Sequence, residues 1–246
     1  AQPRDRPLSA QTVNHITGLL NMIMTEASIR YGFPNPCTAM KRLKLRRGDI
    51  EPFTLQEAKK IIAAVREDFR NYFTLRFFTG MRTGELHGLK WSHIDYERRQ
   101  ILVRETFAKG RTDYTKTDGS QRDIDMSGVV MQALKAQELL TKSRSEYVFC
   151  TRAGTPLDEK NVTDRVWYPL LRHLQLKKRR PYQCRHTCAT FWLASGENPE
   201  WIARQMGHTT TEMLFRTYSR YVPNLTRKDG SAFDRMLEAA MVQAPQ

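Results

Sequence analysis

Apolar residues recur at helical spacing along most of this chain of 246 residues, and this pattern limits the fold more than any other feature. The longest example covers residues 9–30, where Ser9 is the expected N-cap. A Thr-x-x-Glu capping box begins a second helix at Thr54, and Asn198 followed by Pro199 begins a later one. Further helices are expected at residues 71–80, 83–89, 127–140, 160–174, 182–195, 210–220 and 231–243.

Three short stretches, residues 101–103, 114–116 and 122–125, favour β-strands instead. The Asp118-Gly119 pair between the last two is typical of a tight turn and predicts that they form a hairpin. The sequence therefore predicts a mostly α fold with a small antiparallel β-sheet, in the α+β class.

Gly32, two prolines and a basic stretch that contains Gly48 separate the first helix from the rest of the chain. We place a domain boundary near residue 50, which gives a segment 1–50 and a domain 51–246. About fifty residues bury little core by themselves. We therefore expect the first segment to be the end of a larger helical domain whose upstream part is missing.

The chain is strongly basic, with 40 Lys and Arg against 26 Asp and Glu, a net charge of +14 and a pI near 9.9. Each cation that meets a phosphate releases a condensed counterion, so this balance favours nucleic acid as the partner over an anionic membrane surface. Mean hydropathy is −0.60, and no long apolar run predicts a membrane-spanning helix. The candidate DNA-binding residues lie in two basic runs: Lys41, Arg42, Lys44, Arg46, Arg47, Lys177, Lys178, Arg179 and Arg180.

The sequence lacks the motifs of several common phosphate-binding and metal-dependent enzymes. There is no P-loop and no His-Glu-x-x-His, and we expect no metal and no cofactor. Cys184 and Cys188 are not part of a spaced set of four Cys and His ligands for zinc, so we expect them to be buried structural thiols. The low cysteine count favours a reducing cytoplasm. Asp123 and Asp125 alternate on a predicted strand and could bind magnesium. We favour the alternative, in which both side chains face solvent.

A metal-free route to phosphoryl transfer needs cations that stabilise the transition state and a side-chain hydroxyl that attacks phosphorus. Arg82 lies between two glycines at a helix start, with Glu85 one turn on to orient it. Arg185 lies in the first turn of another helix. His208 follows a glycine at a helix-to-helix turn, and Tyr218 comes ten residues later.

In this order, these segments resemble the catalytic domain of a tyrosine recombinase of the phage integrase family, over about residues 53–222. Gly-Met-Arg-Thr-Gly-Glu-Leu resembles the first-arginine box, residues 115–122 resemble the hairpin that carries the lysine, and Tyr-x-x-Arg-His-Thr resembles the second-arginine box. Met-Gly-His and the residues 216–221 resemble the histidine and tyrosine motifs. The resemblance implies the catalytic residues Arg82, Lys116, Tyr182, Arg185, His208 and Tyr218, with Glu85 and His186 in support.

Two positions depart from the family pattern or leave a choice. Tyr182 stands where the family most often has histidine, and a tyrosine can donate a hydrogen bond but cannot act as an imidazole base. Tyr221 lies three residues beyond Tyr218 on the same predicted helix. The family's spacing of nine or ten residues between the histidine and the nucleophile favours Tyr218.

The resemblance also implies a mechanism and partners. Tyr218 would attack a scissile phosphate to give a 3′-phosphotyrosine, Lys116 would protonate the 5′ oxygen, and neither ATP nor metal would be needed. The expected substrate is double-stranded DNA at attachment sites of a prophage or another mobile element, in the cytoplasm of a bacterial host. A homotetramer would assemble on two sites, with accessory DNA-bending or directionality proteins.

The resemblance further implies that residues 1–50 end a core-binding domain and that the helix near the carboxy terminus docks on a neighbouring protomer, with packing in cis as the alternative. Two other functions stay open on the sequence alone. One is a type IB topoisomerase, which shares the catalytic set but relaxes supercoils. The other is a basic DNA-binding module without catalysis.

Overall fold

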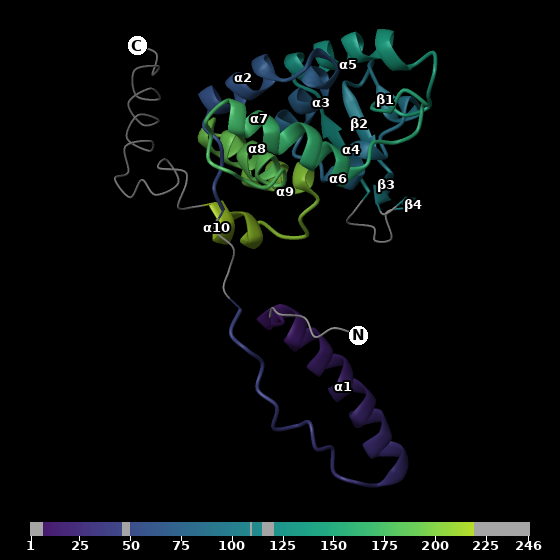
Figure 1. Ribbon diagram of the computed structural model, residues 1–246, viewed down its shortest axis with the longest axis vertical. Coiled ribbons are helices and arrows are strands. Elements are labelled where there is room, and N and C mark those ends of the chain that lie inside the picture. The colour runs from purple at the N-terminus through teal and green to yellow at the C-terminus, as the bar shows by residue number, and fades with distance from the viewer. Residues whose placement is uncertain (1–6, 46–49, 109, 115–120, 219–246) are drawn as a thin grey trace, which may run out of the picture. The chain divides into compact units, whose positions relative to one another are not determined.

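The computed structural model describes residues 7–45, 50–108, 110–114 and 121–218, and it divides the chain into two units, residues 1–49 and 50–246 (Figure 1). None of the helices in these described ranges combines the length and the apolar character needed to cross a bilayer. The predicted helix at 231–243 lies outside the described residues.

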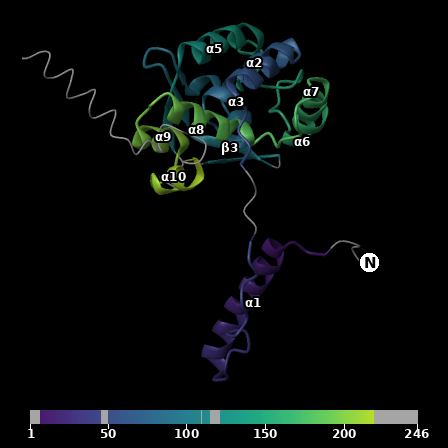
Figure 2. The same cartoon turned by 90° about the vertical axis from the view of Figure 1, so that its left-hand side faces the viewer.

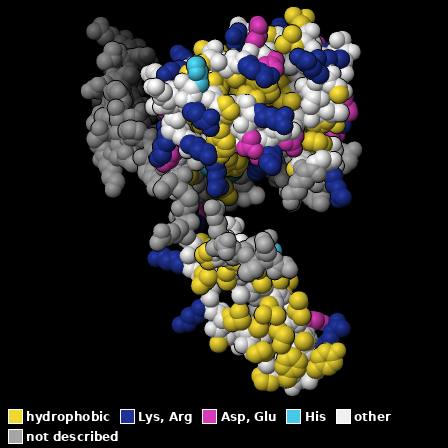
Figure 3. Space-filling view, viewed as in Figure 1, with side chains coloured by type: hydrophobic (Ala, Val, Ile, Leu, Met, Phe, Trp, Pro, Cys, Tyr) yellow, Lys and Arg dark blue, Asp and Glu magenta, His cyan; other side chains and the backbone are white. Residues whose placement is uncertain are grey.

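The first unit contains one long helix, α1 (Ala10–Tyr31). Ser9 caps it as predicted, because the Ser9 side chain accepts a hydrogen bond from the Thr12 N–H, and Gly32 ends it at a positive φ of 67°. The side chain of Asn14 holds the returning chain by two hydrogen bonds of 2.8 Å to the backbone of Leu43. No residue of α1 is buried within the unit, so its apolar face remains exposed (Figure 3).

The second unit contains the helices α2 (Leu55–Ala64), α3 (Glu67–Phe78), α4 (Thr83–His87), α5 (Gly128–Thr141), α6 (Glu159–Val162), α7 (Tyr168–His173), α8 (Gln183–Ala194), α9 (Pro199–Met206) and α10 (Glu212–Tyr218). The capping box at Thr54 forms as predicted, and the Asn198 side chain caps α9. A 3₁₀ turn at Trp91–His93 and a π turn at Thr163–Trp167 complete the helical part.

The strands are β1 (Ile94–Asp95), β2 (Gln100–Val103), β3 (Glu105–Ala108), β4 (Arg111–Tyr114) and β5 (Arg122–Asp125). They form two small antiparallel sheets, one in the order β1-β2-β5 and one of β3 and β4. The mostly α prediction is confirmed, but the strands belong to two sheets, where the sequence predicted one.

The predicted hairpin between residues 114–116 and 122–125 is wrong for the described residues. Tyr114 pairs with Glu105 in β3, whereas β5 pairs with β2 in a register that places Ile124 opposite Ile101. Both isoleucines are fully buried, so β5 pairs where its apolar face joins the core. The Asp118-Gly119 turn itself lies outside the described residues.

The main core surrounds α3, which packs against α2, α5 and α8 (Figure 2). Its rings include Phe73, stacked on Trp167 with centroids 5.4 Å apart, and Phe77. Cys184 and Cys188 are buried on α8, as predicted for structural thiols. A smaller cluster joins α8, α9 and α10 and holds the site; its buried members are Ala189, Leu193, Ile202, Met206, Leu214 and Tyr218.

Candidate active site

The site is organised by the carboxyl end of α9, where Gly207 ends the helix at a positive φ of 63°. The carbonyl oxygens of residues 205–207 accept hydrogen bonds from Arg122, Arg185 and Arg82, in that order. The Arg122 bond measures 2.7 Å and the Arg82 bond 3.5 Å. The last carbonyls of a helix lack partners within it and lie at its negative end. They therefore gather three guanidinium groups from distant parts of the chain.

Glu85 on α4 is the one acid in the described residues that forms an ion pair with any of these arginines. Its two carboxylate oxygens accept from Arg122 at 2.9 and 2.8 Å. They also accept from the Arg82 side chain at 2.8 Å and from the Arg82 backbone N–H at 2.7 Å. Three positive charges thus meet one negative charge, which leaves an excess of positive charge at the site.

The charge state of Glu85 follows from its neighbours. Burial by itself raises the pKa of Glu85, but the hydrogen bonds and charge of Arg122, together with the Arg82 N–H, lower that pKa to about 2. The carboxylate therefore stays ionised near neutral pH and keeps both arginines oriented.

Arg185 is 3% exposed and enters the site from the first turn of α8. Besides the carbonyl of Met206, its guanidinium donates to the carbonyl of Gly80. Gly80 has a φ of 62°, and a Cβ there would lie 2.8 Å from the Met206 sulfur. The absence of a side chain at Gly80 thus leaves room for the Met206 side chain beside the two carbonyls that bind Arg185.

The Tyr218 hydroxyl lies 2.7 Å from Nδ1 of His186, across the packing of α10 on α8. Tyr218 is 2% exposed, and this burial raises the pKa of its phenol, although the charge of Arg185 opposes the rise. Burial, and then the charge of Arg185, lowers the pKa of His186 to about 4. The imidazole at the tyrosine is therefore neutral at pH 7 and can accept a hydrogen bond.

His208 follows the end of α9, and its pKa is lowered to about 4 by burial and by the charges of the three arginines. Its Nδ1 is buried and has no hydrogen-bond partner among the described residues. Tyr182 is 45% exposed, and its ring packs edge-on against His186 with centroids 5.1 Å apart. The structure thus brings five of the six predicted catalytic positions into one region, whereas Lys116 lies outside the described residues.

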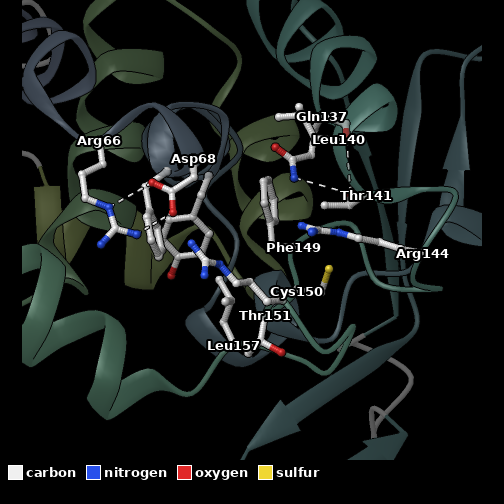
Figure 4. A pocket seen from close by; sticks show the side chains of 13 residues that line it. Arg66, Asp68, Gln137, Leu140, Thr141, Arg144, Phe149, Cys150, Thr151 and Leu157 are labelled. Carbon is white, nitrogen blue, oxygen red and sulfur yellow. Dashed lines mark hydrogen bonds and ion pairs between the residues drawn. The ribbon is translucent and has the colours of Figure 1, made fainter.

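A cavity of about 480 Å³ opens beside Arg122, Gly207 and His208. Asp123 and Asp125 also line it, and both are engaged by protein groups: Asp123 accepts from Arg104 at 2.6 Å, and Asp125 from the Trp201 indole at 2.8 Å. A separate cavity of about 730 Å³, shown in Figure 4, has the Arg66–Asp68 pair at one side and Arg144 at the other. No predicted site residue is among the described residues that line this second cavity.

The family model described as the phage integrase family matches residues 51–224. The chain belongs to the phage integrase family. The resemblance inferred from the motifs is thereby confirmed, and the match covers the whole described part of the second unit from residue 51 onward.

Known integrases and recombinases are similar to the chain over most of its length. The chain is 30% identical over 243 residues to the putative defective protein IntQ of Escherichia coli K12, covering 87% of the chain and 61% of that protein. It is 27% identical over 248 residues to the ICEBs1 integrase of Bacillus subtilis 168, covering 94% and 67%. The chain thus spans about three fifths of the IntQ relative.

Solved structures show the same fold. The Tn1549 transposon integrase in complex with transposon right end DNA superposes with a TM-score of 0.76 at 21% identity, covering 92% of the chain and 80% of that structure. A lambda integrase tetramer bound to a Holliday junction gives a TM-score of 0.64 at 17% identity, covering 82% and 60%. These matches confirm the mostly α fold with small antiparallel sheets.

Arg122 is the residue of this integrase-family site that the sequence analysis missed. Its side chain is 6% exposed and forms the ion pair with Glu85. The signal was present in the strand pattern, because Arg122 lies two residues before the buried Ile124 and so shares its inward face. Asp123 and Asp125 alternate with Arg122 and Ile124 along the strand, so the two acids lie on its exposed face and the arginine on its buried face.

The predicted DNA-binding runs lie in different settings in this integrase-family chain. Lys41, Arg42 and Lys44 are exposed in the first unit, whereas Arg46 and Arg47 lie outside the described residues. In the second unit Lys177 pairs with Glu51, and Lys178 lies over the Tyr168 ring. Arg179 donates to Glu57 at 2.9 and 3.0 Å and lies over the Phe53 ring, which gives it a structural role. Arg180 is exposed.

Gly207→Ala is expected to disturb the site more than a comparable change elsewhere. A non-glycine residue in a left-handed conformation costs about 1–2 kcal/mol. A Cβ at Gly207 would also lie 3.2 Å from the Arg122 side chain. Gly196→Ala is the matched control, because Gly196 has a φ of 86° and nothing within 4 Å of its Cβ position. Urea denaturation should show the larger loss for Gly207→Ala; equal losses would mean that Arg122 is not displaced.

Proposed function

We propose that the chain is the catalytic part of a site-specific DNA recombinase that cleaves and rejoins strands through a 3′-phosphotyrosine intermediate. The observation that carries the proposal is the set of three arginines around one carboxylate, beside a buried tyrosine whose hydroxyl contacts a neutral imidazole. Membership of the phage integrase family supports the same reaction.

The charge at the site suits a phosphodiester. A buried cation without a counterion is costly, and a phosphate oxygen would supply the negative charge that Glu85 alone does not. The Arg82 side chain is 40% exposed and is available to a ligand, whereas Arg122 is enclosed by Glu85 and the end of α9. We assign Arg82 and Arg185 to the non-bridging oxygens, since a guanidinium can bind two oxygens at once.

The reaction proceeds as an exchange of esters. The Tyr218 oxygen bonds to phosphorus while the bond from phosphorus to the 5′ oxygen breaks, and Lys116 gives that oxygen a proton. His208 and Tyr182 donate hydrogen bonds to the phosphate. A 5′ hydroxyl of the partner duplex then attacks the phosphotyrosine and releases Tyr218. The ester conserves the bond energy and the guanidinium groups supply the stabilising charge, so the reaction requires neither ATP nor a metal ion.

The first unit has the features of part of a DNA-binding domain. α1 exposes large apolar side chains, including Ile16, Leu19 and Ile23, which further helices of that domain would cover. Lys41, Arg42 and Lys44 provide positive charge for a DNA backbone. We therefore assign residues 1–50 to the end of a core-binding domain and residues 51–246 to the catalytic domain.

Attachment-site DNA of a prophage or mobile element is the proposed substrate, in the bacterial cytoplasm. The solved lambda integrase tetramer on a Holliday junction supports an assembly of four protomers on two sites. Accessory DNA-bending or directionality proteins are the remaining proposed partners.

The test is a trapping assay with the wild-type protein. The substrates are duplexes with the sequence of the junctions between the host chromosome and the mobile element that encodes the protein. Each carries a nick near the cleavage site, so that the cleaved fragment diffuses away and the covalent intermediate accumulates. In EDTA, a denaturing gel should show a protein–DNA adduct, and mass spectrometry of its peptides should place the phosphate on Tyr218. Tight binding to a junction duplex without any adduct would favour the non-catalytic DNA-binding module.

A further inference from the structure

The imidazole in contact with the proposed nucleophile is that of His186, one residue after Arg185. The contact joins Nδ1 to the Tyr218 oxygen at 2.7 Å, and the two rings have centroids 5.6 Å apart. For His208, which the family motif places in the active site, the described residues give no hydrogen bond to Tyr218, and its Nδ1 lies buried without a partner among them.

The surroundings of His186 fix the direction of this hydrogen bond. Burial, and then the positive charge of Arg185, disfavours an imidazolium, so Nδ1 carries a lone pair and the phenol donates to it. The rings of Tyr182 and Tyr218 pack against the His186 imidazole, and a proton on His186 would lower the pKa of His208. No carboxylate hydrogen-bonds to His186 within the part of the chain that the structure describes.

The position of His186 on α8 also explains how Tyr182 is accommodated. Residues 182 and 186 are one helical turn apart, so their side chains share a face of the helix. The Tyr182 ring, at the place where the family most often has histidine, packs at 79° against the His186 ring and limits its rotation. On this face of α8 the imidazole is therefore supplied by position 186, one turn after position 182.

We propose that His186 is the proton acceptor for Tyr218: Nδ1 takes the phenol proton as the tyrosine oxygen bonds to phosphorus, and returns it when the phosphotyrosine bond breaks. The proton leaves the phenol as the phosphorus–oxygen bond forms, while the 5′ oxygen departs with a proton from Lys116, so charge and atoms balance in each direction. This inference rests on the proposed strand-transfer function. A phenol ionises with an ordinary pKa of about 10, and burial raises the pKa of Tyr218 further, so the reaction needs a proton acceptor close to the hydroxyl.

The experiment combines a substitution at position 186 with a change in the acidity of the nucleophile. His186→Asn keeps a hydrogen-bonding group near Nδ1 but cannot hold a proton. We expect it to slow adduct formation on the nicked trapping duplex by about 100- to 10,000-fold, the usual contribution of acid–base catalysis, with unchanged affinity for the duplex. Incorporation of difluorotyrosine at position 218, whose phenol ionises more readily, should restore most of the lost rate. His173→Asn, at an exposed histidine of α7, serves as the control.

The outcomes separate this inference from the proposed function. If the wild-type protein forms no adduct on a duplex that it binds tightly, the proposed function fails first. If the wild type reacts and His186→Asn reacts equally fast, His186 accepts no proton. A slow variant that difluorotyrosine does not restore would give His186 a structural role only. Restoration by a duplex with sulfur in place of the 5′ oxygen would assign His186 to the leaving group. Each of these last three results overturns the inference.

Discussion

Tyr218→Phe is expected to abolish covalent attachment to DNA while leaving DNA binding intact. The Tyr218 ring is 2% exposed and packs with Leu214 and Met206 in the cluster of α8, α9 and α10, and phenylalanine retains that packing. The variant loses the hydroxyl and its hydrogen bond to His186. Because no other group takes over bond formation to phosphorus, the rate of adduct formation should fall by roughly 10⁴-fold or more, the scale of losing a nucleophile.

The measurement is the trapping assay with a parallel gel-shift titration of the same duplex. Tyr168→Phe on α7 is the matched control, since its ring contacts Lys178 and lies outside the site. Adduct formation that persists in Tyr218→Phe would contradict the assignment and make Tyr221 the nucleophile.

Glu85→Gln is expected to cause the largest loss of stability at the site. The substitution removes the one carboxylate that pairs with Arg122 and Arg82 in the described part of the chain, and both Glu85 and the Arg122 side chain are almost fully enclosed. Breaking a buried ion pair from one side costs about 3–5 kcal/mol. Denaturation followed by tryptophan fluorescence should show a loss of this size at neutral pH.

Asp68→Asn provides the comparison for Glu85→Gln. Asp68 also pairs with an arginine, Arg66, but their side chains are 59% and 67% exposed. Exposed pairs contribute at most about 1 kcal/mol, so this variant should remain close to the wild type. Equal losses in the two variants would contradict the role given to Glu85.

Glu85→Gln should also change how the free energy of unfolding depends on pH. The folded-state pKa of Glu85 is about 2, below its ordinary value of 4.5, so the unfolded chain binds its proton more readily. The stabilisation by Glu85 is therefore complete above pH 4.5 and is lost as the pH falls toward 2. The gap in unfolding free energy between wild type and Glu85→Gln should narrow over this interval. A gap that stays constant down to pH 2 would refute the ionised pair.

Local signals predicted most of the helices of this fold. Ser9, Thr54 and Asn198 cap helices where the sequence placed them, because a cap depends on residues within one turn of the chain. The strand pairing failed for the opposite reason. The Asp-Gly pair favours a turn locally, but the partner of β5 is decided by the burial of Ile101 against Ile124, which lie far apart in the sequence.

In the candidate site, too, local motifs predicted the residues, whereas a contact between distant parts of the chain was not predicted. The ordered motifs predicted Arg82, Arg185 and Glu85 as site residues because each lies in a recognisable segment, and the structure places all three together. The motifs did not indicate that His186 contacts Tyr218. That contact spans 32 residues and depends on how α10 packs on α8, which a spacing rule does not contain.

The three arginines at the end of α9 are held by main-chain oxygens, and every amino acid has the same main-chain carbonyl. The acceptors for Arg122 and Arg185 therefore do not depend on the side chains of Gln205 and Met206, provided that the helix ends at the same point. Glu85 has no such freedom, because its acceptors belong to the side chain. The arginine contacts should therefore constrain residue identity at Glu85, whereas at Gln205 and Met206 it is the burial of the side chains that limits replacement.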